Sequence, residues 1–148
     1  NLKTLTIGGL VRQVAPGDDV QAAIDAVSRE GGGTVQLIGK TFLMTSNIEL
    51  KNNVFLIGAG RDVTVLDFEG RALGVFAIGI SSSEISNFSV KDLTIQNSNR
   101  VAGLDINFCN LFSIERVGVS SCDQKGIRIK DSNDFILINT LCSSNTGN

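Results

Sequence analysis

Residues 103 to 144 read GLDINFCNLFSIERVGVSSCDQKGIRIKDSNDFILINTLCSS, and one pattern occurs twice within this stretch. The run GLDI at 103–106 recurs 23 positions later as GIRI at 126–129. Asn87, Asn110 and Asn133 form a row with the same spacing of 23. Short strands repeated at this period are typical of a parallel β-helix, in which each coil stacks on the next at about 4.8 Å. The sequence therefore predicts an all-β solenoid.

Alternation along the repeated strands assigns each side chain to a face. Leu104 and Ile106 are expected to point into the coil, so the residues between them point outward. The outward set that we interpret as a candidate substrate-binding face is Asp105, Asn107, Lys125, Arg128 and Lys130. A solvated face with an Asp105–Arg128 cross-strand pair, worth at most about 1 kcal/mol, is the alternative. We interpret the asparagine row as a structural ladder of stacked amides at a turn.

The region before the coils contains one helical pattern. Its apolar positions follow i, i+3, i+4 and i+7, and they are Val20, Ala23, Ile24 and Val27. Asp18 or Asp19 suits the N-cap, and Gly31 suits the end of the helix. The glycines at 31–33 follow the C-terminal end of this helix, whereas anion sites use the N-terminal end, so we interpret them as a turn.

These signals predict a single domain over residues 1–148. We expect an opening strand in 1–17, a capping helix in 18–31 and about five coils in 33–148. Asn53 lies 34 positions before Asn87, which predicts an insertion of about half a coil near residues 69–83.

Open coil ends expose sheet edges, which must be covered. We expect the helix to cover the first coil. The last residues, CSSNTGN, follow a strand without a cap. The chain is therefore expected to be a fragment of a longer β-helix, or to have this end covered by further coils, self-association or a partner.

Residues 22–68 resemble the N-terminal cap and first coils of right-handed parallel β-helix proteins of the pectate lyase-like superfamily. GGGTV at 31–35, LKNNV at 50–54 and GAG at 58–60 carry the resemblance. The chain departs from the usual Pro, Gly and Tyr at Ile38, Lys40 and Phe42. Members include mannuronan epimerases, polygalacturonases and phage tailspikes. The resemblance implies a polysaccharide partner, a cleft along one outward sheet face, and an extracellular or virion-surface location.

The catalytic motifs of these relatives are missing from the sequence. The chain has no histidine and no tyrosine. The Asp-Pro-His-Glu signature of the epimerases is absent, and RIK at 128–130 is the one match to a polygalacturonase motif. Catalytic residues therefore stay unknown. We expect no cofactor, and no metal site, because acidic side chains do not cluster as Ca²⁺ requires. Cys109, Cys122 and Cys142 show no metal-binding spacing and are expected to be free thiols.

Composition excludes two further partners. A net charge of −2 and a pI near 5.0 do not favour nucleic acid, and no apolar run is long enough for a membrane span. Two hypotheses follow. The chain is a module of a polysaccharide-processing lyase, hydrolase or epimerase, favouring an acidic polysaccharide and with catalytic residues outside this chain. Alternatively, it is a non-catalytic structural or carbohydrate-binding β-helix, as in a tailspike or adhesin.

Overall fold

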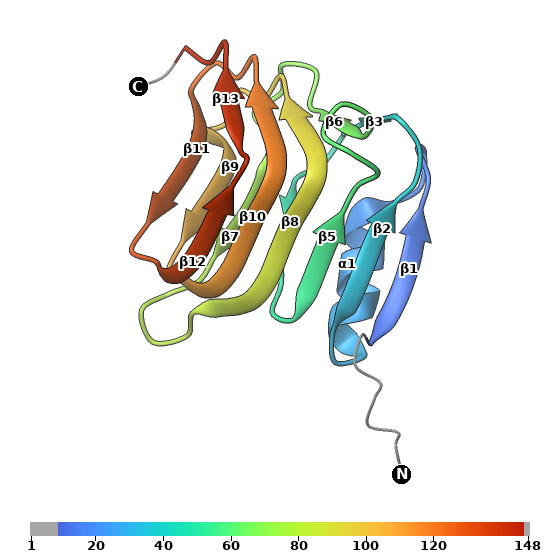
Figure 1. The fold of residues 1–148 in the computed structure, drawn as a ribbon, viewed down its shortest axis with the longest axis vertical. Helices are drawn as coiled ribbons and strands as arrows, with labels where there is room; N and C mark the ends of the chain where they lie inside the picture. Colours follow the sequence, from blue (N-terminus) through green and yellow to red (C-terminus); the bar gives the residue numbers. More distant parts are fainter. Residues whose placement is uncertain (1–8, 147–148) are drawn as a thin grey trace.

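The computed structural model describes residues 9–146, which form one helix and parallel strand ladders in two sheets. Sheet A contains β1 (Leu10–Val14), β2 (Gly33–Leu37), β5 (Val54–Ile57), β8 (Ile85–Gln96), β10 (Cys109–Ser120) and β12 (Asn133–Ile138), in that order. Figure 1 shows this order running from one side of the molecule to the other. Sheet B contains β4 (Ile48–Glu49), β7 (Val75–Ile78), β9 (Ala102–Asn107) and β11 (Lys125–Lys130).

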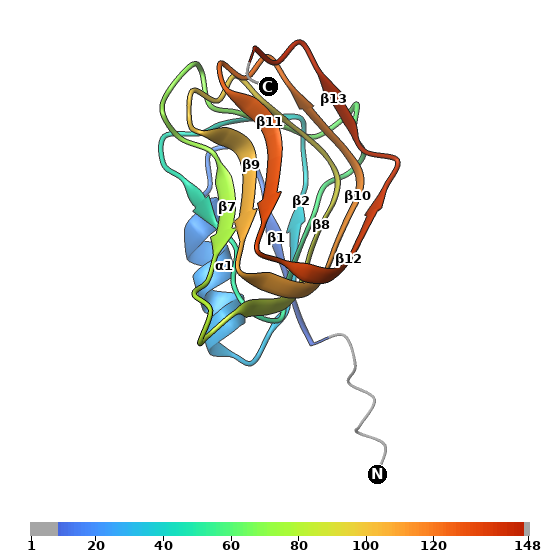
Figure 2. The ribbon, with the colours of Figure 1, turned by 90° about the vertical axis from the view of Figure 1, so that its left-hand side faces the viewer.

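Each complete coil has three sides because the long strands of sheet A bend. Asp92 in β8 and Arg116 in β10 have φ of 56° and 52°, and this left-handed conformation turns the strand. Beyond the bend, β6 (Val65–Asp67) pairs with β8, and β13 (Leu141–Ser143) pairs with β10. The short β3 (Thr41–Leu43) pairs with β6. Figure 2 looks along the stack, where β11, β12 and β13 outline one coil.

The predicted fold class, a right-handed parallel β-helix with an N-terminal capping helix, is confirmed. On the main path of sheet A, the five strands β2, β5, β8, β10 and β12 follow the helix, as expected for about five coils. The expected opening strand also joins the stack, because β1 pairs in parallel with β2 and adds a sixth rung. The part of that expectation that falls on residues 1–8 lies outside the described residues.

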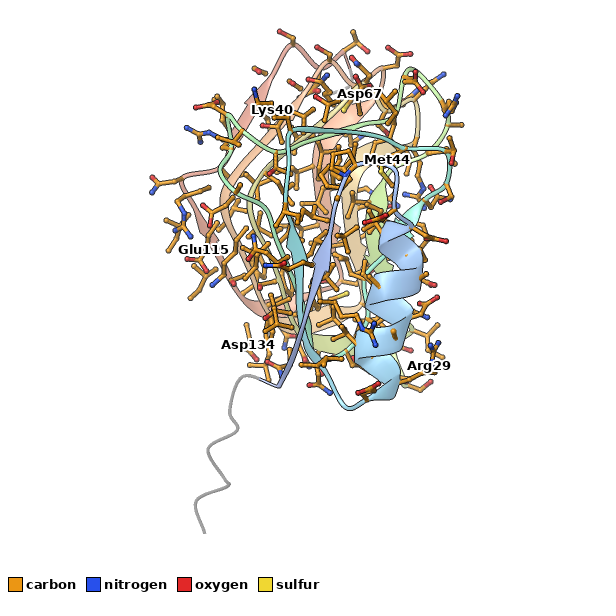
Figure 3. The ribbon with its side chains drawn as sticks, turned by 90° about the vertical axis from the view of Figure 1, so that its right-hand side faces the viewer. Arg29, Lys40, Met44, Asp67, Glu115 and Asp134 are labelled. Carbon is orange, nitrogen blue, oxygen red and sulfur yellow. The ribbon has the colours of Figure 1, made fainter. Side chains whose placement is uncertain are left out.

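Helix α1 (Val20–Arg29) covers the first coil. Val20, Ile24 and Val27 are buried against the strands, and Figure 3 shows the helix alongside the strands at this end of the stack, with Arg29 near the lower end of the helix. Asp19 is the N-cap and accepts the Ala22 N–H at 3.0 Å. The helix is shorter than the expected 18–31, because its caps lie outside the helical segment.

The glycines at 31–33 end the helix and let the chain pass close to the backbone of β1. Gly31 has a φ of 94°, a left-handed conformation that suits glycine after a helix. The Gly32 N–H donates to the Val27 carbonyl at 2.9 Å. A Cβ on Gly33 would lie 2.1 Å from the Leu10 carbonyl oxygen, so only glycine fits beside β1. The stretch is a turn, and its strand β2 begins at Gly33.

The core is built from columns of residues stacked between coils. One column in sheet A is Val35, Leu56, Val90, Ile114 and Leu137. Its members are fully buried as far as Ile114, whereas Leu137 on the last rung is 48% exposed. The rings of Phe88, Phe112 and Phe135 form a second column with centroids 5.0 and 4.9 Å apart.

The register differs from the predicted asparagine row. Asn110 aligns with Asn133 but with Ser86 on the other side, so Asn87 is one position out of line. The β8-to-β10 spacing is 24 along its whole length, whereas the predicted asparagine row requires a spacing of 23. Asn87 Nδ2 instead donates to Asn53 Oδ1 at 2.7 Å, and Asn110 Nδ2 donates to Glu84. The three residues therefore do not form one ladder.

The extra length in the early coils is also split rather than gathered near residues 69–83. The register spacing is 34 from β5 to β8 but 29 from β6 to β8 and from β7 to β9. It falls to 24 between β8 and β10. Two loops therefore hold about five extra residues each, one at 58–64 and one at 79–84. The second contains the loop-like ISSSE segment.

Candidate functional site

The outer face of sheet B carries two rows of side chains that run across the coils. The first row is Glu49, Phe76, Asp105 and Arg128. The second row is Ile78, Asn107 and Lys130. The alternate residues of the same strands, such as Leu104 and Ile106, are fully buried in the core. The predicted assignment of faces therefore holds for four of the five candidate residues.

Asp105 is the centre of this face, and two arginines hold it. Arg128 Nε donates to Asp105 Oδ1 at 2.8 Å, and Arg128 Nη2 donates to Oδ2 at 2.9 Å. Arg100 Nη1 donates to the same Oδ2 at 2.8 Å. The Asp105 side chain has no exposed surface, whereas Arg100 is 21% and Arg128 is 32% exposed. The expected cross-strand pair is present, but it is a buried carboxylate under two arginines rather than a solvated pair.

Arg100 reaches the site from the turn between β8 and β9. Its guanidinium carbon lies 4.6 Å from the centre of the Phe76 ring, in a cation–π contact. The fully buried Ser98 fixes the turn, because its Oγ donates to the Leu73 carbonyl at 2.6 Å and accepts the Arg100 N–H at 3.2 Å. Arg100 is therefore fixed by the Phe76 ring at its guanidinium group and by Ser98 at its backbone.

The charges of the site are coupled. Burial raises the pKa of Asp105, but hydrogen bonds from Arg128 and Arg100 outweigh it, and the pKa lies below its ordinary value of 3.8. The hydrogen bond with Asp105 likewise raises the pKa of Arg128. The site therefore carries one negative and two positive charges over the ordinary pH range, which leaves one unit of positive charge.

The remaining candidate residues, Lys130, Asn107 and Lys125, lie outside the cluster of Asp105, Arg100 and Arg128. Lys130 is exposed on the second row and pairs with Asp131 at 2.8 Å. Asn107 lies between Ile78 and Lys130, and its Oδ1 is buried without a hydrogen-bond partner among the described residues. Lys125 begins β11 and shares the alternation of the core residue Ile127, so it does not belong to either outward row. Lys125 is itself exposed at the start of the strand, and its contact with a substrate stays a prediction.

A second arginine–aspartate pair lies elsewhere on the coil and provides a comparison. Arg116 Nη2 donates to Asp92 Oδ2 at 3.1 Å, where β8 and β10 bend. The hydrogen bond from Arg116 lowers the pKa of Asp92. Both side chains remain partly exposed, at 47% and 27%. The pair resembles Asp105–Arg128 in chemistry but not in burial, and it lacks a second arginine.

The arrangement on sheet B favours anion binding over proton transfer. A carboxylate with a lowered pKa is a weak proton acceptor. Partly exposed guanidinium groups pair with carboxylates, commonly through two parallel hydrogen bonds. Within residues 9–146, no cluster of three or more His, Cys, Asp or Glu side chains could hold a metal ion. No helix of the described chain is long and apolar enough to cross a membrane.

Two residues of this site were missed by sequence reasoning. Arg100 lies in a turn outside the repeated strands, so the period of 23 does not reach it. Phe76 lies 29 positions before Asp105, in the irregular early coils. Arg100 could have been identified as a cationic residue in the turn just before GLDI, where it can reach the outward carboxylate of Asp105.

Proteins of known activity share this fold and part of this sequence. The chain is 38% identical over 96 residues to mannuronan C5-epimerase AlgE6 from Azotobacter vinelandii, covering 58% of the chain and 11% of that protein. It is 29% identical over 92 residues to alginate lyase 7 from the same organism, again covering 11% of the relative. The chain thus spans about a tenth of the length of these relatives. No family model matches the sequence.

Solved structures extend the similarity over most of the chain. The A-module of mannuronan C5-epimerase AlgE6 superposes with a TM-score of 0.70 and 26% identity, covering 85% of this chain and 39% of the module chain. The A-module of AlgE4 superposes with a TM-score of 0.58 and 27% identity, covering 85% and 45%. The resemblance to β-helix proteins of the mannuronan epimerase type is therefore confirmed.

Proposed function

We propose that this chain, a parallel β-helix similar to epimerase A-modules, is a module of a polysaccharide-processing protein that acts on an acidic polysaccharide. The observation that carries the proposal is the similarity to two kinds of protein named for such polymers, mannuronan epimerases and an alginate lyase. An extracellular location is part of the same proposal and rests on the same similarity.

The outer face of sheet B is the surface that we assign to the polymer. Arg100 and Arg128 leave one unit of positive charge there, and Lys130, which is paired with Asp131, is exposed in the second row of the same face. A uronate polymer carries one carboxylate per sugar, which is the group that arginine and lysine bind. Phe76 and Ile78 supply an apolar surface on the same face. We propose substrate contacts for Asn107, Arg128, Lys130 and Arg100, with Asp105 beneath them.

A second candidate is a non-catalytic, carbohydrate-binding β-helix. The state of Asp105 favours it, because the one carboxylate at the centre of the face is paired with two arginines and is a weak base. The chain also contains no histidine or tyrosine that could transfer the proton instead. In this second case the chain binds the polymer without turning it over.

One experiment tests the proposal and separates the two candidates. The full chain is mixed with mannuronan and with alginate, and binding is measured by titration calorimetry with neutral dextran as the control polymer. In the same samples, NMR follows inversion at C5 and the appearance of unsaturated sugar ends. Binding with turnover supports an enzyme, and binding without turnover supports the second candidate. Absence of binding to both acidic polymers at low salt contradicts the proposal.

Matched variants assign the surface. Arg128→Ala removes a charge from the proposed face, whereas Arg12→Ala removes an exposed arginine of β1 that lies 4.0 Å from Glu30. We expect only the first change to weaken binding. An equal loss in both variants would show that the polymer senses net charge rather than this face.

A further inference from the structure

The most unusual feature of the outer face is that two guanidinium groups share one carboxylate oxygen. Arg100 and Arg128 both donate to Asp105 Oδ2, so they lie side by side although they carry like charges. Without the aspartate they would repel each other in a partly buried site. Asp105 thus keeps the two arginines together, while its single charge offsets only one of theirs.

Exposure separates the role of Asp105 from the role of the arginines. The Asp105 side chain is 0% exposed and both of its oxygens are occupied, so it cannot touch a ligand. The arginines are partly exposed. In the described part of the chain, Nη1 of Arg128 and both Nε and Nη2 of Arg100 make no further side-chain hydrogen bond. Donors are therefore left over beside a carboxylate that is not accessible.

The two arginines are also held in place before any ligand arrives. Phe76 packs against the Arg100 guanidinium, and Ser98 fixes the turn that carries it. Arg128 is fixed by its two parallel bonds to Asp105. Freezing a long side chain during binding costs conformational entropy, and this cost is reduced where the side chain is already ordered.

We propose that Asp105 is a positioning residue that joins Arg100 and Arg128 into one receptor for a single sugar carboxylate of an acidic polysaccharide. This inference rests on the proposed function and names the group that the face selects. A second carboxylate completes the charge balance of the cluster, two positive groups against two negative ones. A neutral sugar lacks the charge that the receptor is built to match, so the receptor discriminates against neutral polymers.

Asp105→Asn separates two explanations, because a positioning role for Asp105 and an effect of net charge predict opposite changes in affinity. The change removes a negative charge, so a face that acts only through net charge would bind an acidic polymer more tightly. If Asp105 positions the arginines, they separate and affinity falls, on the order of tenfold. Asp92→Asn is the matched control, because it removes the same charge beside Arg116 on another side of the coil.

The measurement is titration of the full chain with mannuronan oligosaccharides and with the same oligosaccharides after reduction of their carboxyl groups. We expect wild type and Asp92→Asn to prefer the acidic form equally, and Asp105→Asn to lose most of this preference. Unchanged or tighter binding by Asp105→Asn overturns the inference and leaves the proposed function standing. Failure of the wild type to bind the acidic form overturns both.

Arg100→Lys and Arg128→Lys cover the case in which Asp105→Asn does not fold, which circular dichroism would reveal. Each keeps the charge but loses the planar group that can donate to Asp105 and to a ligand together. We expect each variant to bind acidic oligosaccharides more weakly than the wild type, on the order of tenfold. The control Arg116→Lys should bind them as tightly as the wild type. Equal affinity in all three lysine variants would overturn the inference.

Discussion

The side chain of Gln21 hydrogen-bonds both backbone groups of Glu49, so that helix α1 completes the free edge of sheet B. The Glu49 N–H donates to Gln21 Oε1 at 2.7 Å, and Gln21 Nε2 donates to the Glu49 carbonyl at 3.1 Å. Glu49 lies in β4, the first strand of sheet B, whose other edge pairs with β7. One amide side chain therefore takes the place of a missing neighbouring strand.

Gln21→Ala is expected to destabilise the chain by about 1 kcal/mol or more, because it leaves two backbone groups of β4 without partners. The measurement is the free energy of unfolding from urea titration. Gln13→Ala is the control, since Gln13 is an exposed glutamine on β1, the terminal strand of sheet A. Equal stability of the two variants would show that the edge of β4 needs no partner.

The ion pairs of the buried Asp105 with Arg100 and Arg128 make the free energy of unfolding depend on pH. The folded-state pKa of Asp105 lies below its ordinary value, so its contribution is complete above pH 4 or so and is lost as the pH falls through the folded-state pKa. We expect the wild-type free energy of unfolding to fall steeply below about pH 4.

Asp105→Asn should cost about 3 kcal/mol near neutral pH, because it breaks a buried pair, and should flatten the acid limb of the profile. Asp92→Asn removes a more exposed pair, so its profile should stay close to that of the wild type. The check is urea unfolding at a series of pH values. If the plot of unfolding free energy against pH for Asp105→Asn were parallel to that of the wild type, the pKa of Asp105 would be the same in the folded and unfolded chain.

The sequence predicted the fold most reliably where the period is constant. GLDI and GIRI align in the structure as their spacing of 23 requires, since Leu104 pairs with Ile127 and Ile106 with Ile129. Column packing enforces this register, because a slip of one residue would turn the buried residues outward. Asn87 broke the pattern because backbone conformation, rather than residue identity, is what repeats at the corner: Asn87, Leu111 and Asp134 all have positive φ.

The candidate site was predictable only in part, for a similar reason. Alternation identified Asp105 and Arg128, because both lie on regular strands. It did not reveal Arg100, whose position depends on a turn held by Ser98, nor the burial of Asp105, which depends on that turn. Lys125 was assigned to the outer face although it shares the alternation of Ile127, two residues on. Contacts from loops lie outside what a strand period can predict.

The corner position of Leu111 offers a stabilising substitution. Leu111 has a φ of 50°, which costs a residue with a large side chain roughly 1 to 2 kcal/mol, and its side chain is 61% exposed. Asparagine tolerates this conformation, as Asn87 does on the preceding coil. We expect Leu111→Asn to raise the free energy of unfolding by about 0.5 to 1 kcal/mol.

The matched control for this change is Leu43→Asn. Leu43 is 63% exposed and lies in the strand β3, where the backbone conformation does not favour asparagine. Its substitution should be neutral or slightly destabilising in the same urea titration. If both variants gain stability equally, loss of an exposed apolar side chain, rather than relief of backbone strain, accounts for the effect.

The three free cysteines should react at very different rates with a thiol reagent. Burial raises the pKa of Cys109 to about 11, and its Sγ lies 3.2 Å from the Ala77 carbonyl oxygen, to which it donates. Only about one in a thousand such groups is a thiolate at pH 8, and the thiolate is the reacting form. Cys122 is also buried, whereas Cys142 is exposed on β13.

We therefore expect one equivalent of thiol to react quickly in the native chain and three after unfolding in urea. Cys142→Ser should abolish the fast phase and leave the slow phase unchanged, because the other two sulfurs lie inside the coil. Absorbance of the released reagent follows both phases. Rapid reaction of two or more equivalents in a chain with native circular dichroism would show that the coil opens around Cys109 or Cys122 more readily than their burial predicts.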